Sequence, residues 1–198
     1  MSKKRDLHEP RENFKPFEYP EMIKFSEAIQ HSYWLHSEFN FTQDISEFHN
    51  EVSEHEKEAV CRAMLAISQI EACSVKTFWA SIHRQLPKPE VLVVGSVFAE
   101  SEARHSITYS VLLEKLGLNH RFEEIFEVKE IVDRHNYLKK YKDFVGARLE
   151  KNYLKSLILF TIFIESASLF GQFFVMSAFN KHKKIFTDLS TAIMATSK

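Results

Sequence analysis

Apolar residues recur every three to four positions along most of this chain, which is the spacing of a helix with one buried face. Met64, Ile67 and Ile70 show this spacing within one stretch. The same pattern predicts six helices, at about 20–34, 54–86, 90–116, 122–144, 148–180 and from 183 onward. The fourth is charged and amphipathic, whereas the fifth is apolar almost throughout. The pattern therefore predicts an all-α fold.

Local signals support these helix boundaries. Ser53 and Glu56 have the spacing of a capping box, and Gly117 is suited to a left-handed helix end. Only 4 Gly and 5 Pro occur among 198 residues, which favours long uninterrupted helices over a turn-rich β fold. We expect a polar N-terminal arm at residues 1–18 and one helical domain at residues 19–198.

Composition narrows the class of protein. The formal net charge of −1 gives no indication of nucleic-acid binding. Cys61 and Cys73 form no CxxC motif, which argues against a thiolate zinc site and fits a reducing cytoplasm. Residues 156–179 are long enough to span a membrane, but a charge at the position of Glu165 would cost about 2.5–3.5 kcal/mol there. We therefore expect a cytoplasmic protein that binds neither nucleic acid nor membrane.

One short motif carries most of the chemical information. Glu102 and His105 lie one helical turn apart and Tyr109 follows one turn later, so the three side chains share a helix face. Glu71 and Glu165 each interrupt an apolar stretch of another predicted helix. Together these residues indicate most of a carboxylate-bridged dimetal centre inside a helix bundle. Carboxylates with imidazole suit iron or manganese better than structural zinc.

Each of these residues also has an ordinary structural interpretation. Glu71 can lie in water at the edge of its apolar face, and an ExxH spacing often arises by chance. A buried Glu165 costs several kcal/mol unless it is paired or bound to metal, and a salt bridge to Arg104 or another basic residue would meet that need. Tyr109 and Trp34 can be plain core residues. Three helices that each present an acid from an apolar face nevertheless favour the metal site.

At these residues the chain resembles the small, radical-generating subunit of aerobic class I ribonucleotide reductase, over nearly its whole length from about residue 20. The segments that carry the resemblance are 32–34, 53–57, 67–71, 98–109 and 163–165. Their order and spacing are far more specific than the ExxH motif alone. The resemblance implies a ferritin-like helix bundle with a dimetal-carboxylate site between core helices.

The resemblance also implies metal ligands. Glu71 matches a terminal acidic ligand of the first metal, and Glu102 matches the glutamate that bridges both metals. His105 matches the histidine on the first metal, and Glu165 matches a ligand of the second. The implied cofactor is a pair of iron or manganese ions.

Two further residues match redox positions of that family. Tyr109 matches the tyrosine that holds the stable radical, and Trp34 matches the tryptophan that carries electrons toward the large subunit. The implied activity is the generation of a tyrosyl radical with oxygen, in support of deoxyribonucleotide synthesis. The implied partners are the large subunit and a second copy of the small subunit, in a homodimer or a higher assembly.

The sequence departs from the family pattern near its C-terminal end. The family has a second acid-x-x-His on the sixth helix, and no second ExxH occurs here; residues 195–198 look like the stretch just before it. The helical domain is thus expected to be incomplete there, through a split gene, truncation or degeneration. The apolar face from Ile185 to Met194 favours a second small-subunit polypeptide that supplies the missing motif. The alternatives are a ferritin-like metal oxidase without radical transfer and an inactive helical fragment.

Overall fold

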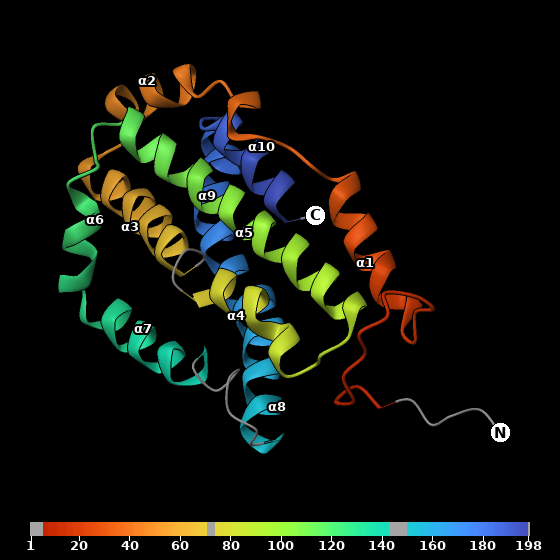
Figure 1. Cartoon of the computed structure of the whole chain (residues 1–198). Coiled ribbons are helices and arrows are strands. Elements are labelled where there is room, and N and C mark those ends of the chain that lie inside the picture. Colours follow the sequence, from red (N-terminus) through yellow and green to blue (C-terminus); the bar gives the residue numbers. More distant parts are fainter. Residues whose placement is uncertain (1–5, 71–73, 143–149, 198) are drawn as a thin grey trace.

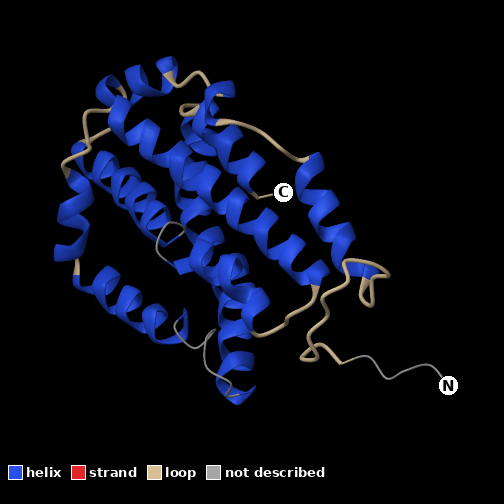
Figure 2. Ribbon diagram, viewed as in Figure 1, coloured by secondary structure: helices blue, strands red, loops and turns tan. Residues whose placement is uncertain are grey.

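The computed structural model describes residues 6–70, 74–142 and 150–197. Within these residues every regular element is a helix, which confirms the all-α prediction (Figure 2). The α-helices are α1 (Pro20–His31), α2 (Thr42–Asn50), α3 (Glu54–Ile70), α4 (Lys76–Ser81), α5 (Pro89–Lys115), α6 (Arg121–Glu124), α7 (Lys129–Lys142), α8 (Glu150–Ile158), α9 (Leu169–Lys183) and α10 (Thr187–Thr196). Three 3₁₀ turns, η1 (His36–Glu38), η3 (Ile82–Arg84) and η4 (Ile125–Glu127), and a π-helical segment, η6 (Leu159–Ser168), lie between them.

Helix α5 runs through the middle of the bundle (Figure 1). It packs against α1, α3 and α4, while α9 packs against α3 and α10. Pro89 occupies its first turn, where a missing backbone N–H costs nothing. Gly117 follows its end with φ of +74°, as predicted from the sequence. This helix carries the ExxH motif, so the motif lies at the centre of the fold.

Residues ahead of α1 are held against the start of α5 by one buried carboxylate. Glu90 is fully buried, and its Oε1 accepts the backbone N–H groups of Glu18 and Tyr19, each at 2.9 Å. Its Oε2 forms an ion pair with Arg11. These bonds fix the point at which the chain enters α1, which leads directly to Trp34.

The predicted helix at 122–144 is interrupted. The chain instead forms α6, η4 and α7, because Val128 adopts an extended conformation with ψ of 106° between the last two. The predicted helix at 54–86 appears as α3 and then α4, with residues 71–73 between them outside the described part of the chain. The predicted capping box is confirmed: the Ser53 N–H donates to Glu56 Oε2 at 2.9 Å.

Helix α10 begins later than residue 183. Lys184 and Phe186 have φ of +64° and +61°, and these left-handed residues separate α9 from α10. The start of α10 is anchored by α2, from which Asp44 accepts the N–H groups of Asp188 (3.2 Å) and Leu189 (2.6 Å). A carboxylate at this end also complements the helix dipole. The anchor positions the far end of α10 near α5.

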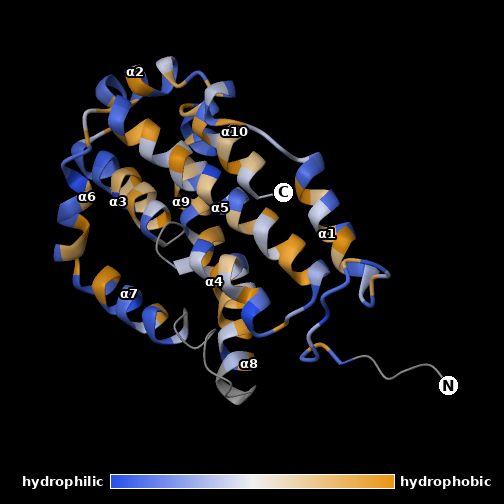
Figure 3. Cartoon of the chain, in the orientation of Figure 1, coloured by the Kyte–Doolittle hydropathy of each residue, from blue (hydrophilic) through white to orange (hydrophobic). Residues whose placement is uncertain are grey.

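Within the described residues, the apolar stretch predicted at 148–180 forms one continuous helical rod, α8–η6–α9, from Glu150 to Lys183. By length and composition its part Tyr153–Lys183 could cross a membrane, and 22% of its most apolar window is buried. A single helix of this kind is weak evidence for a membrane, because the core helix of a soluble protein passes the same test of length and composition. Figure 3 shows hydrophobic positions mixed with hydrophilic ones along α9, as well as along α5.

Candidate metal centre

The structure places the ExxH motif and its tyrosine on one buried face of α5. Glu102, His105 and Tyr109 are 4%, 7% and 0% exposed. His105 Nδ1 lies 3.5 Å from Glu102 Oε2, and the other ring nitrogen lies 3.3 Å from the Ser101 hydroxyl. The first separation is short enough for imidazole and carboxylate to share one cation.

Glu165 faces the same region from the π-helical segment η6. π-Helical turns are rare and occur frequently at functional sites. Burial, followed by the negative charge of Glu102, raises the pKa of Glu165 to about 8, and a hydrogen bond from the Trp79 indole opposes this rise. Glu102 and Glu165 are therefore close enough to interact electrostatically. Two carboxylates in a poorly solvated site favour a proton or a cation between them.

The salt bridge considered for Glu165 is not formed. Arg104 instead donates through Nε to Glu100 at 2.9 Å and through Nη1 to the carbonyl of Trp34 at 3.1 Å. The partner that Glu165 does have is Trp79, whose Nε1–H donates to Oε1 at 3.0 Å. The interpretation of Glu165 as one half of a structural ion pair is wrong for this fold.

A cavity of about 260 Å³ brings the candidate ligands together. The candidate ligands Glu102, His105 and Glu165 line this cavity. The C-terminal end of α10 also lines it. Its lining comprises Ile29, Ser32, Trp34, Phe98, Ser101, Glu102, Arg104, His105, Glu165, Ser166, Leu169, Phe170, Phe173, Ala195, Thr196 and Ser197. The predicted neighbours of the ExxH motif thus meet in one place.

One atom in this cavity indicates that the site suits a cation. Glu102 Oε2 is buried and has no hydrogen-bond partner among the described atoms. Leaving a buried carboxylate oxygen unsatisfied is costly, and a metal ion would satisfy it. Two carboxylates and one imidazole are also the donor types that iron and manganese take. The residues present fit such a metal.

The described residues form only part of such a site. They contain no group of three or more His, Cys, Asp or Glu side chains arranged to hold a metal ion. The predicted ligand Glu71 lies outside the described residues. Glu102, His105 and Glu165 therefore line the cavity as candidate ligands and do not by themselves form a metal site.

Tyr109 is fixed by a hydrogen bond to the last turn of α10. Its hydroxyl lies 3.2 Å from Thr196 Oγ1, and Thr196 donates its own hydroxyl hydrogen to the Ala192 carbonyl at 2.9 Å. This contact ties the phenol of Tyr109 to the last turn of α10.

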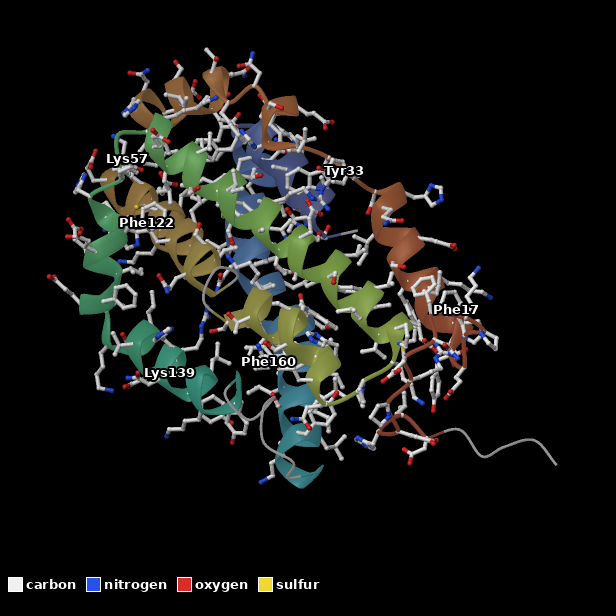
Figure 4. The ribbon with its side chains drawn as sticks, in the orientation of Figure 1. Phe17, Tyr33, Lys57, Phe122, Lys139 and Phe160 are labelled. Carbon is white, nitrogen blue, oxygen red and sulfur yellow. The ribbon has the colours of Figure 1, made fainter. Side chains whose placement is uncertain are left out.

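Trp34 stacks on His105. Their ring centroids are 5.6 Å apart with an interplanar angle of 14°, and Trp34 is 7% exposed. Arg104 lies over the ring of the neighbouring Tyr33, 4.3 Å from its centroid. Tyr33 is exposed at the end of α1 (Figure 4). The buried indole that stacks on His105 therefore directly follows an exposed residue, Tyr33, in the chain.

Sequence reasoning missed Trp79 and Thr196. Neither stands at helical spacing from the ExxH motif, and each comes from a different helix. The one available signal was the scarcity of tryptophan, of which the chain has 2. Both tryptophans contact candidate ligands, Trp34 at His105 and Trp79 at Glu165.

Similarity to known proteins agrees with this geometry. The family described as ribonucleotide reductase, small chain, matches residues 11–198. A probable ribonucleoside-diphosphate reductase small subunit of Invertebrate iridescent virus 3 is 28% identical over 187 residues, 87% of this chain and 49% of the viral protein. Its counterpart in Invertebrate iridescent virus 6 is 26% identical over 180 residues, 85% and 50% of the two chains. The chain spans about half the length of these relatives.

Solved structures share the fold. An R2-like ligand-binding oxidase with an aerobically reconstituted Mn/Fe cofactor superposes with a TM-score of 0.80 at 16% identity, over 91% of this chain and 64% of that chain. A putative class I ribonucleotide reductase from Bacillus halodurans gives a TM-score of 0.79 at 18% identity, over 90% and 64% of the two chains. These likenesses confirm the predicted ferritin-like bundle, and the match over residues 11–198 shows that the chain belongs to the ribonucleotide reductase small-chain family, a family of oxidoreductases.

Proposed function

We propose that this chain is a small-subunit component of ribonucleoside-diphosphate reductase that generates a tyrosyl radical for deoxyribonucleotide synthesis in the cytoplasm. The observation that carries the proposal is the cavity in which an unpartnered oxygen of Glu102 meets His105 and Glu165, one helical turn from the buried Tyr109. Membership of the small-chain family supports the same function.

Glu102, His105 and Glu165 would hold two iron or manganese ions together with Glu71. When bound, the metal pair would use oxygen to oxidise Tyr109. Burial and the charge of Glu102 raise the pKa of Glu165 to about 8, so protons would compete with a cation for this carboxyl group. The Mn/Fe cofactor of a solved structural neighbour supports a two-metal site in this fold.

Tyr109 would lose one electron to the metal centre and one proton from its hydroxyl. The hydrogen bond between Tyr109 and Thr196 would keep the phenol oriented during this oxidation. Full burial protects the resulting phenoxyl radical from solvent. Trp34, stacked on His105, would carry the electron that connects this site to the large subunit of the reductase.

The remaining ligands would come from outside residues 1–198. Ala195, Thr196 and Ser197 line the cavity beside the candidate ligands, so a segment that enters there reaches the site. We propose that a second small-subunit polypeptide supplies an acid-x-x-His helix at this place. The complete assembly would contain two copies of this unit together with the large subunit.

Electron paramagnetic resonance with metal analysis tests the function on protein purified from its native source with its associated chains. We expect a tyrosyl radical signal, about two metals per assembled site, and a co-purifying polypeptide with an acid-x-x-His motif. Tyr109→Phe keeps the ring and removes the hydroxyl, so it should abolish the radical and leave the metal content unchanged. A radical that persists in this variant would refute the assignment to Tyr109.

A ferritin-like metal oxidase without radical transfer is the second candidate. It is favoured by the structural likeness to R2-like ligand-binding oxidases. The same experiment separates the two functions, because an oxidase would bind metal and consume oxygen without an organic radical. A chain that binds no metal in any assembly would be an inactive helical fragment.

A further inference from the structure

Trp79 makes a directed contact with a candidate metal ligand. Its indole N–H donates to Glu165 Oε1 at 3.0 Å, across 86 positions of sequence. Trp79 lies on α4 and Glu165 on η6, so the bond joins two elements that each pack around the site. The indole is 8% exposed. An N–H bond to a carboxylate in such surroundings is stronger than one in water.

The position of Trp79 is fixed by α5. Its ring lies 4.3 Å, centroid to centroid, from Phe98, which is one turn before Glu102 on α5. Gly95 lies one further turn back and faces the backbone of α4. A Cβ at Gly95 would stand 2.7 Å from the Trp79 carbonyl oxygen, closer than such atoms come in proteins. The absence of a side chain there allows α4 to approach α5 closely enough for the indole to reach Glu165.

We propose that Trp79 is a positioning residue of the metal centre, which occupies Oε1 of Glu165 and so presents Oε2 to a cation. This inference deepens the proposed function and rests on it. A free carboxylate can rotate and offer either oxygen or both. The indole is held in place by Phe98 and by the close contact at Gly95. Its N–H therefore restricts the rotation of the Glu165 carboxylate in the metal-free protein. Glu165 then enters the ligand set through one chosen oxygen.

Manganese binding by the assembly, purified with its associated polypeptides, tests the role of Trp79 without any measurement of activity. Free Mn(II) gives a six-line resonance that is lost on binding, so a titration yields an affinity for each variant. We expect Trp79→Phe to weaken Mn(II) binding by about 10–100-fold, the usual effect of removing a group that orients a ligand. Glu165→Gln should weaken it at least as much, because it removes the ligand itself.

Phe78→Leu is the matched control. Phe78 neighbours Trp79 on α4, is fully buried, and stacks on Phe160 with centroids 4.7 Å apart, but its ring has no polar atom. This variant weakens the packing of α4 and leaves the indole N–H in place. We expect its Mn(II) affinity to stay within about threefold of the wild type, well below the effect of losing an orienting group. Circular dichroism establishes that all variants are folded.

A second readout reports the hydrogen bond directly. The chain has 2 tryptophans, so a ¹⁵N–¹H spectrum contains two indole resonances, and Trp34→Phe assigns them. The Trp79 resonance should move in Glu165→Gln, because the acceptor of the indole N–H changes from a carboxyl group to an amide. Unchanged Mn(II) affinity in Trp79→Phe, beside a loss in Glu165→Gln, would overturn the role of Trp79 alone. No Mn(II) binding by the wild-type assembly would overturn the metal site and this role together.

Discussion

The carboxylate of Glu90 offers a quantitative test of how the chain enters the bundle. Glu90→Gln keeps the size and shape of the side chain but removes its charge and one acceptor. If the amide oxygen continues to accept the N–H groups of Glu18 and Tyr19, the amide nitrogen faces the guanidinium of Arg11, and two donors oppose each other. Breaking a buried ion pair from one side costs about 3–5 kcal/mol.

The lower end of this range applies here. The Arg11 side chain is 13% exposed, and it retains hydrogen bonds to the carbonyls of Phe14 and Pro16. A loss of about 3 kcal/mol corresponds to roughly a 100-fold change in an equilibrium constant. We therefore expect hydrogen exchange at the Glu18 and Tyr19 amides to become about 100-fold faster.

Glu54→Gln is the control for that measurement. Glu54 pairs with Lys57 at 2.7 Å but is 88% exposed, and exposed pairs contribute about 0.2–1 kcal/mol. In Glu54→Gln, hydrogen exchange at the Glu18 and Tyr19 amides should be the same as in the wild type. Equal protection of those amides in Glu90→Gln and the wild type would refute the view that Glu90 holds this segment.

Two further substitutions have defined outcomes. Burial raises the pKa of Asp44 from 3.8 to about 6. The protonated form of Asp44 therefore contributes about 3 kcal/mol more to the free energy of unfolding than the charged form. Because the folded value is the higher one, this contribution is complete below about pH 4 and is lost as the pH rises through about 6. In urea unfolding, the free energy of unfolding of the wild type minus that of Asp44→Asn should increase as the pH falls from about 7.5 to 4. A difference that stays constant with pH would contradict the raised pKa of Asp44. Gly95→Ala should destabilise the fold by about 1–3 kcal/mol through its clash with the Trp79 carbonyl, whereas an open helical site would gain stability from the same change.

Several features of the fold could be predicted because they depend on residues near one another in sequence. The capping box of Ser53 and Glu56 and the left-handed Gly117 are local, and both were predicted correctly. The interruption at Val128 was not predicted. Residues 122–144 keep a helical pattern across the break, so periodicity alone gives no sign of the extended residue.

In the candidate metal centre, too, the local features were predicted and the long-range contacts were not. Glu102 and His105 were predicted to share a face because three residues span almost one helical turn, and their side chains lie 3.5 Å apart. The partner of Glu165 was not predicted. A charge in an apolar stretch indicates only that some partner exists, and Arg104, the example considered as an alternative to metal, is bonded to Glu100 instead. The roles proposed for Glu71, Tyr109 and Trp34 stay predictions until metal and radical are measured.

The sequence by itself determined where helices form and which side chains share a face, because helical geometry is set by residues three and four positions apart. The tertiary structure decided which of those faces meet. Trp79 reaches Glu165 across 86 positions, and Asp44 caps α10 across 145. These contacts depend on how closely two helices approach each other, as α4 and α5 do at Gly95. They also depend on where the backbone becomes π-helical, as it does in η6. Such distances follow from packing of the whole chain, which no local pattern encodes.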